Sequence, residues 1–163
     1  MVQCLDTLLK EHVCSTPIGV LGVSYGAVLA LQWAAIDPRV QSVTAISPYL
    51  NPDIAVDRYL KAFAPNLTWR TDGEAAADVA SRLSIFADLD TVTAVRHIKH
   101  PILFIRAEHD EVCFQEDLSR LQRAGAPGSE IKEILLANHL LVGMCITQLG
   151  ETVTDWFHSR LTR

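Results

Sequence analysis

Apolar residues recur along the chain with two periods, one typical of helices and the other of strands. Apolar positions at i, i+3 and i+4 predict amphipathic helices, and one Ala- and Leu-rich stretch is apolar on nearly every side. Helices are predicted over 2–13, 27–36, 114–124 and 146–161. Short apolar or β-branched runs bounded by turn residues predict strands, and the first of them reads as buried on both faces. Strands are predicted over 17–23, 40–46, 101–107 and 131–137.

The segment between the second and third predicted strands differs from the rest of the chain in its predicted secondary structure. The second strand ends at Ser47-Pro48, and Asn51-Pro52 then forms a favourable helix start, with the helix running to about Phe63. A loop is predicted over 65–73, and further helical segments are predicted over 74–86 and 91–98. No strand is predicted in this part of the chain. Residues 49–97 are therefore interpreted as a helical insertion.

Helices and strands alternate on either side of this insertion. Such alternation indicates an α/β protein with a mostly parallel sheet of about four strands, flanked by helices on both faces. The chain has 163 residues, the length of one ordinary domain. We therefore expect a single α/β domain over 1–163 with a helical cap or lid over 49–97.

Composition and charge narrow the classes of partner. Hydrophobic residues make up 49% of the chain and charged residues 20%, as in soluble globular proteins. The formal net charge is −5 and no run of Lys or Arg occurs, which argues against nucleic acid or an anionic membrane as a partner. No apolar stretch approaches the roughly 18 residues of a membrane span. Asp6, Lys10 and Glu11 interrupt any signal-peptide core, so we expect a cytoplasmic protein.

The cysteines also favour a cytoplasmic protein. Cys4, Cys14, Cys113 and Cys145 lie far apart in the chain and form no CxxC pair. Without an export signal, we expect reduced and mostly buried thiols rather than disulfides.

The sequence from Gly22 to Gly26 matches the motif G-x-S-x-G. It directly follows the predicted strand 17–23 and opens the helix over 27–36, which is the setting that a nucleophilic serine in this motif requires. A serine at the apex of so sharp a turn has strained backbone angles, so its neighbours must be small. We expect Gly22, Gly26 and Ala27 to meet this need. Alternatively, the glycines only permit close packing of strand against helix.

Two further residues with suitable chemistry follow later strands. A serine hydroxyl is a poor nucleophile until a base removes its proton and a carboxylate orients that base. Asp110 follows the predicted strand 101–107, and His139 follows the predicted strand 131–137. Ligand-facing groups of a parallel sheet gather at the carboxyl ends of its strands. We therefore expect Ser24, Asp110 and His139 at one edge of the sheet.

Residues 15–163 resemble the C-terminal part of an α/β-hydrolase. The matching segments are VLGVSYGA at the nucleophile elbow, PILFIRAEHD at the strand and loop of the acid, and ANHLL at the histidine loop. The chain order Ser, Asp, His is the order of the triad in that family. A helical cap between the elbow and the acid strand is also common in the family, and residues 49–97 occupy that place.

The resemblance implies a role for each residue. Ser24 would be the nucleophile, His139 the general base and then acid, and Asp110 the carboxylate that orients His139. The backbone N–H of Tyr25 would be one oxyanion donor. The implied function is a serine hydrolase that cleaves a carboxylic ester, thioester or related acyl bond of a small-molecule substrate through an acyl-enzyme. No cofactor and no metal are implied.

Other residues compete for these roles. Some members of the family carry the acid one strand earlier, and other carboxylates flank Asp110. The rival acids are Glu108, Glu111, Asp53 and Asp57. His109 is the rival base, although it adjoins the acid in sequence. A metal site is a further alternative, on four residues whose spacing is loose for zinc. These residues are His97, His100, His109 and Cys113.

The resemblance breaks at the front of the chain. In the family several strands precede the nucleophile, and a loop from one of them supplies the second oxyanion donor, often through an HGGG-type motif. Here 23 residues precede Ser24 and no His-Gly pair occurs. We therefore expect an unpartnered edge on strand 17–23, in an N-terminally incomplete chain or one that pairs with a second copy or another chain. The alternative function is a non-catalytic interaction module or an inactive fragment.

Overall fold

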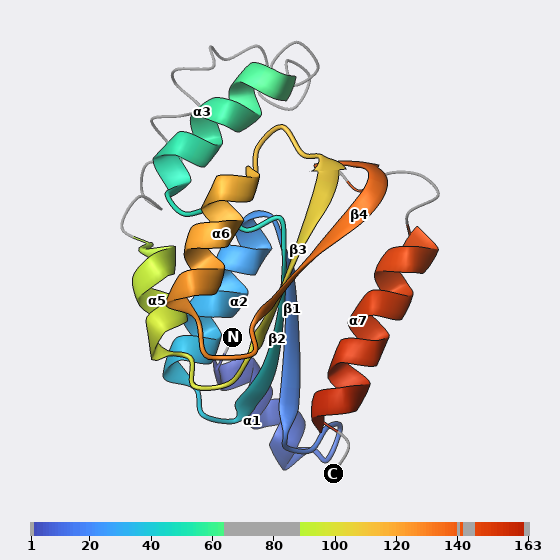
Figure 1. Ribbon diagram of the computed structural model, residues 1–163. Coiled ribbons are helices and arrows are strands. Elements are labelled where there is room, and N and C mark those ends of the chain that lie inside the picture. The colour runs from blue at the N-terminus through green and yellow to red at the C-terminus, as the bar shows by residue number, and fades with distance from the viewer. Residues whose placement is uncertain (1, 64–88, 140, 142–145, 162–163) are drawn as a thin grey trace, which may run out of the picture.

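The computed structural model describes residues 2–63, 89–139, 141 and 146–161 (Figure 1). Four parallel strands form one sheet in the order β1-β2-β3-β4. They are β1 (Ile18–Val23), β2 (Val40–Ile46), β3 (Ile102–His109) and β4 (Glu130–Asn138). The helices are α1 (Val2–Lys10), α2 (Tyr25–Ile36), α3 (Pro52–Phe63), α5 (Thr91–His97), α6 (Gln115–Ala124) and α7 (Ile146–Leu161). The predicted α/β class and parallel sheet are confirmed.

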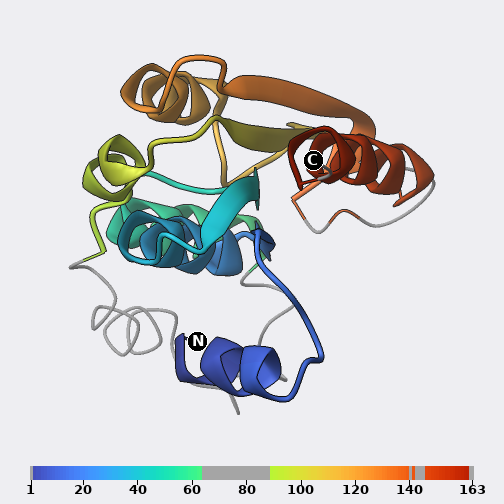
Figure 2. The same cartoon turned by 90° about the horizontal axis from the view of Figure 1, so that it is seen from below.

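Helices cover both faces of the sheet (Figures 1 and 2). α2, α5 and α6 pack together on one face, and α7 packs on the other. The larger core cluster lies under the first layer and includes Leu31 and Phe104, whereas Trp156 of α7 joins the second cluster. α2 is apolar all round because the sheet, α5 and α3 surround it, which explains its lack of a polar stripe. Beyond β1, at the end of the sheet opposite β4, lies α1 (Figure 2).

The register of the sheet brings the carboxyl ends of the strands together. Val23 pairs with Ile46 across β1 and β2, and Ile46 pairs with Ile105 across β2 and β3. Residues that follow these positions therefore emerge at the same edge of the sheet. Strand β4 continues the ladder, with a shift of register near its end between Ala107 and His109 of β3.

The helical insertion is described only in part. α3 begins at Pro52 and ends at Phe63, as predicted, whereas the loop over 65–73 and the helix over 74–86 lie outside the described residues. α5 packs against α2, and its Val95 belongs to the main core beside the sheet. The last part of the segment 49–97 thus lies within the helical layer of the α/β unit, while the extent of a cap remains a prediction.

Two sequence expectations need correction. The thiols are not mostly buried: Cys113 is buried, but Cys4 is exposed and Cys14 is half-buried, and all three are free. Cys145 lies outside the described residues. The first helix ends at Lys10, short of residue 13, because residues 11–13 form a turn and a bend in which His12 has a positive φ of 57°.

The first strand has an open edge. Among the described residues β1 pairs with β2 alone, so the backbone groups on its other side meet no strand. Leu21 and Val23 of this strand are 47% and 41% exposed. An exposed apolar edge strand is a surface on which another strand can pair.

Within the described part of the chain, no helix combines the length and apolar character needed to cross a membrane.

Asp37 is the C-cap residue of α2, and its buried carboxylate accepts several hydrogen bonds. Its carboxylate accepts from Trp33 Nε1 at 3.0 Å and from Arg39 Nε at 2.8 Å and Nη2 at 2.7 Å. The hydrogen bond from the Arg39 side chain is the main cause that holds the pKa of the Asp37 carboxyl below its ordinary value; burial opposes it, and the Trp33 hydrogen bond adds to it.

Replacing Asp37 by Asn is expected to lower the free energy of unfolding by about 2 kcal/mol at pH 7, because charge-assisted hydrogen bonds are lost. Since the folded-state pKa is lowered, the stabilisation is complete above the unfolded pKa of about 4 and is lost as the pH falls through the folded value. Urea unfolding at pH 7 and pH 3 measures both effects. The control is Asp57→Asn, since Asp57 is 61% exposed and forms a surface ion pair with Lys61. Equal losses in the two variants would contradict the prediction.

Candidate active site

Ser24 sits in a strained turn between β1 and α2. Its backbone has φ 52° and ψ −119°, a region that L-residues rarely adopt. The amide of Ser24 donates to the carbonyl oxygen of Ile46 at 2.8 Å, so the turn stays attached to the end of β2. This geometry places Ser24 at the carboxyl end of the sheet and at the N-cap of α2.

The two glycines of the motif have different roles. A Cβ on Gly22 would lie 2.1 Å from the carbonyl oxygen of Gly26, so only glycine fits at position 22. A Cβ on Gly26 would meet no described atom within 4 Å. A steric need for glycine is therefore visible at position 22, whereas at position 26 a Cβ finds space and the expected need for a small residue stays a prediction. Close packing of the strand against the helix at Gly22 and the strained turn at Ser24 occur together.

The structure brings the three predicted residues into one hydrogen-bonded chain. Ser24 Oγ lies 2.9 Å from His139 Nε2, and His139 Nδ1 lies 2.8 Å from Asp110 Oδ1. The three residues come from the ends of β1, β3 and β4. The side chains of His139 and Asp110 are 2% and 0% exposed. A hydroxyl, an imidazole and a buried carboxylate are thus aligned at the edge of the sheet.

Several donors hold the carboxylate of Asp110. Its Oδ1 accepts from the amides of Val112 at 3.0 Å and Cys113 at 2.8 Å, and its Oδ2 accepts from Ser47 Oγ at 2.6 Å. Burial raises the pKa of this carboxyl and is the largest single influence. The hydrogen bond and charge of His139, with the Ser47 and Cys113 hydrogen bonds, together outweigh burial and leave the pKa below its ordinary value. Asp110 is therefore an ionised acceptor at neutral pH.

The ionised carboxylate determines the tautomer of His139. Because Asp110 can only accept, Nδ1 of His139 must carry the proton that it donates. With the proton on Nδ1 alone, Nε2 is an acceptor to which Ser24 Oγ can donate. This arrangement suits removal of the hydroxyl proton by the imidazole.

No sequence motif indicated a functional role for Ser47. In the sequence, Ser47-Pro48 marks the end of a strand, yet Ser47 occupies the same place after β2 as Ser24 does after β1. The available signal was a second serine directly after a buried strand next to the elbow strand. Ser47 has a φ of 49° and is fully buried.

Aromatic residues surround the imidazole. The rings of Tyr59 and Phe63 on α3 lie 6.1 Å and 6.4 Å from that of His139, and α3 lies beyond the carboxyl ends of the strands (Figure 1). Tyr25 and Tyr49 stack at 6.5 Å nearby in the same apolar cluster. Burial, with a smaller contribution from Tyr25, raises the pKa of Tyr49, so this phenol stays neutral. The surroundings of the candidate site are thus largely apolar.

Among the rival acids, Glu108 Oε2 accepts from the amide of Leu136 at 2.8 Å. Glu111 accepts from the backbone amide of His139 at 3.4 Å, not from its ring. Asp57 pairs with Lys61 on the surface, and the side chain of Asp53 lies outside the described residues. The rival base His109 is 66% exposed and lies 3.7 Å from Glu108. None of the described rivals contacts the ring of His139 through a hydrogen bond in this structure.

The residues of the alternative metal site do not converge. His97 and His100 precede β3, whereas His109 and Cys113 lie at or beyond its other end. The Cys113 thiol donates to the carbonyl oxygen of Pro48 at 2.8 Å, and burial is the main cause that raises its pKa. Across the ranges that the structure describes, no group of three His, Cys, Asp or Glu side chains could hold a metal ion.

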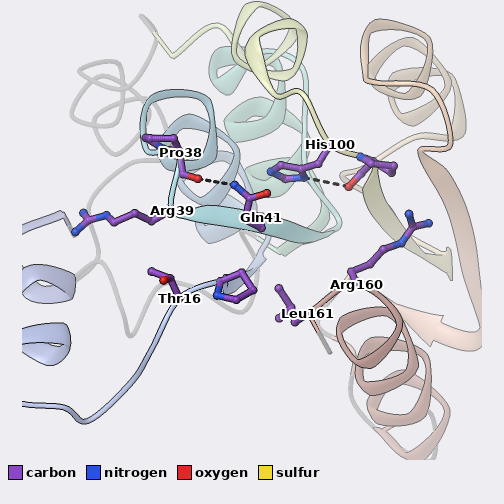
Figure 3. A pocket seen from close by; sticks show the side chains of 9 residues that line it. Thr16, Pro38, Arg39, Gln41, His100, Arg160 and Leu161 are labelled. Atoms are coloured by element: carbon purple, nitrogen blue, oxygen red, sulfur yellow. Dashed lines mark hydrogen bonds between the residues drawn. The ribbon is translucent and has the colours of Figure 1, made fainter. Parts of the chain in front are cut away.

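A cavity of about 700 Å³ lies at the other end of the sheet (Figure 3). It is bounded by the amino ends of three strands and the last turn of α7. Its lining is Thr16, Pro17, Pro38, Arg39, Gln41, His100, Pro101, Arg160 and Leu161. The Arg39 guanidinium turns away from the cavity toward Asp37 and Asp6. This cavity is separate from the group formed by Ser24, His139 and Asp110.

Many solved structures resemble this fold. An esterase from Pyrococcus furiosus has a TM-score of 0.71 and 21% sequence identity, over 88% of this chain and 54% of that chain. The esterase domain of a Rhodothermus marinus protein has a TM-score of 0.65 and 18% identity, over 87% and 61%. A putative non-heme bromoperoxidase from Mycobacterium tuberculosis has a TM-score of 0.65 and 21% identity, over 94% and 71%. This chain therefore spans little more than half of the two esterase chains.

Comparison of sequences agrees with the fold. No curated protein matches the chain. A family model described as alpha/beta hydrolase fold matches residues 1–96, a segment that includes Ser24, while Asp110 and His139 follow it in the chain. Since this model matches more than half of the 163 residues, and the parallel sheet and the similar structures agree with it, the chain belongs to the alpha/beta hydrolase fold family.

Proposed function

We propose that this protein is a serine hydrolase that cleaves a carboxylic ester, thioester or related acyl bond of a small-molecule substrate. The observation that carries the proposal is the hydrogen-bonded series from Ser24 Oγ through His139 to a buried, ionised Asp110. Membership of the alpha/beta hydrolase fold family and the likeness to two esterases support it. The fold alone would not, because one fold serves many chemistries.

In the proposed reaction, Ser24 Oγ attacks the acyl carbon while His139 Nε2 takes the hydroxyl proton. Asp110 stays ionised and stabilises the imidazolium through Nδ1. The proton then passes from Nε2 to the leaving alcohol or thiol as the tetrahedral intermediate collapses to an acyl-enzyme. Water, activated by His139, attacks this ester and releases the acid and free Ser24.

The backbone N–H of Tyr25 is the proposed oxyanion donor. Tyr25 is the first residue of α2 and directly follows Ser24, so its amide lies at the positive end of the helix dipole. Stabilisation of this kind is worth about 3 kcal/mol per donor in serine hydrolases. The aromatic rings around His139 favour substrates whose acyl or alcohol part is apolar.

Labelling with a fluorophosphonate probe tests the proposed function. The oxygen of an activated serine displaces fluoride from the probe and is phosphonylated, whereas ordinary serines are spared. The folded protein is expected to take up one probe molecule, and peptide mapping by mass spectrometry is expected to find it on Ser24. Hydrolysis of short p-nitrophenyl esters should stop as labelling proceeds. Heat-denatured protein is the control and should stay unlabelled. A folded sample that neither labels nor hydrolyses the esters would overturn the proposal.

A second candidate function rests on the open edge of β1. That edge pairs with no strand in the described part of the chain, and Leu21 and Val23 beside it are exposed. We propose, as the alternative, a non-catalytic role in which a second copy or another chain adds a strand there. Sedimentation at micromolar concentration should then show a dimer or larger species. A clean monomer that labels at Ser24 would exclude self-pairing and favour the hydrolase.

A further inference from the structure

We infer that Ser47 is a positioning residue, which holds the carboxylate of Asp110 in the orientation that His139 needs. The inference rests on the proposed function of the Ser24, His139 and Asp110 series. Its basis is the contact between Ser47 Oγ and Asp110 Oδ2 at 2.6 Å, between two buried side chains.

The hydrogen bonds of Asp110 divide between its two oxygens. Oδ1 accepts from His139 Nδ1 and from the amides of Val112 and Cys113. On Oδ2 the described donor is the hydroxyl of Ser47. Rotation of the carboxylate about its Cβ–Cγ bond would move Oδ1 away from His139. The Ser47 hydroxyl opposes that rotation because it fixes the other oxygen.

The backbone at Ser47 is held in an uncommon conformation. Its φ of 49° lies in the left-handed region, which is unfavourable for a residue with a side chain. The amide of Ser47 donates to the carbonyl oxygen of Ile105 at 2.7 Å, and the hydroxyl reaches Asp110. The main chain and the side chain thus both tie Ser47 to β3 and the loop that follows it. A strained residue held by two contacts beside reacting groups is more typical of a site than of ordinary packing.

Loss of the Ser47 hydroxyl should have two consequences. The carboxylate would lose alignment with His139, which slows the chemical step. It would also lose a donor that stabilises its charge, so it would hold the Nδ1 proton more strongly and favour the imidazolium. Other titratable groups that contact the pair are Glu111 at the His139 amide, Cys113 at Oδ1 through its amide, and Tyr59 edge-on to the imidazole. None of these three contacts is made by the Ser47 side chain.

Two variants distinguish the effect of the Ser47 hydroxyl from the effect of backbone strain at this residue. Ser47→Ala and Ser47→Gly both remove the hydroxyl, but only Ser47→Gly relieves the left-handed strain. We expect kcat for ester hydrolysis to fall about tenfold in both, with KM within about twofold of the wild type. The acid limb of the kcat/KM profile should move to higher pH in both. Ser42→Ala is the control, because Ser42 is a buried serine of β2 whose hydroxyl has no hydrogen-bond partner among the described residues.

A measurement that needs no activity completes the test. The proton shared by His139 Nδ1 and Asp110 should give a low-field proton NMR resonance in the folded protein. We expect Asp110→Asn to abolish it, the Ser47 variants to shift or broaden it, and Ser42→Ala to leave it unchanged. Folded Ser47→Ala and Ser47→Gly proteins with wild-type kcat and an unshifted resonance would overturn the inference. If the wild type shows the resonance but no hydrolysis, the proposed function fails, and the resonance still tests the role of Ser47.

Discussion

Replacing His139 by alanine is expected to lower kcat for ester hydrolysis by about six orders of magnitude, to the level left by binding and oxyanion stabilisation alone. The reason is geometric. His139 Nε2 lies 2.9 Å from Ser24 Oγ and is the proposed base that removes its proton. Without the imidazole, the hydroxyl keeps its proton at neutral pH and cannot attack. Labelling of Ser24 by a fluorophosphonate should be lost in parallel.

His109→Ala is the matched control for this variant. His109 adjoins Asp110 in the chain, but its side chain is 66% exposed and lies beside Glu108. Its loss should change kcat by less than about twofold, since within the described residues its side chain makes no hydrogen bond to Ser24, His139 or Asp110. Initial rates with a p-nitrophenyl ester and circular dichroism spectra of both variants test this. A folded His139→Ala protein with more than a tenth of wild-type kcat would contradict the assignment, and so would inactivation by His109→Ala.

Replacing Gly22 by alanine is expected to lower the free energy of unfolding by at least about 3 kcal/mol, since the new methyl group meets rigid backbone. The ideal Cβ lies 2.1 Å from the carbonyl oxygen of Gly26 and 2.6 Å from the amide nitrogen of Ala27. Neither atom belongs to a side chain that can rotate away, so β1 and α2 would have to separate. A loss of this size is a large share of the roughly 5–15 kcal/mol that stabilises an ordinary domain.

Gly26→Ala is the matched comparison, because Gly26 is the other glycine of the G-x-S-x-G motif. Its Cβ would enter space free of described atoms within 4 Å, in the first turn of α2. The free energy of unfolding should change by less than about 1 kcal/mol, and the higher helix propensity of alanine favours a small gain. Urea or thermal unfolding of both proteins provides the measurement. Equal losses would show that the steric difference between the two positions is unimportant.

The fold was predictable because most of the strands are short apolar or β-branched runs bounded by turn residues. PIGVLGV and PILFIRA predicted β1 and β3 to within two residues at either end. The grouping of Ser24, Asp110 and His139 was predictable for a related reason. Each follows a parallel strand, and parallel strands deliver their carboxyl ends to one edge. Periodicity and the order of elements therefore carry much of the information about this site.

Other features depend on atoms far apart in the chain, so local patterns do not reveal them. Ser47 and Asp110 are 63 residues apart, and only the pairing of β2 with β3 makes them neighbours. The motif also contains two glycines without telling them apart, whereas a Cβ clashes at Gly22 and finds space at Gly26. The exposure of Cys4 was mispredicted because the thiol's general preference for burial says nothing about which face of α1 it occupies.

The two left-handed serines have a consequence for how this site tolerates change. The amide of Ser24 donates to β2 and the amide of Ser47 donates to β3, so each turn is held at a fixed position relative to the neighbouring strand. The spacing of the site is thus a property of the main chain. A proline at position 47 would remove the amide that donates to Ile105 and so break the series at β3, without replacing Ser24, His139 or Asp110.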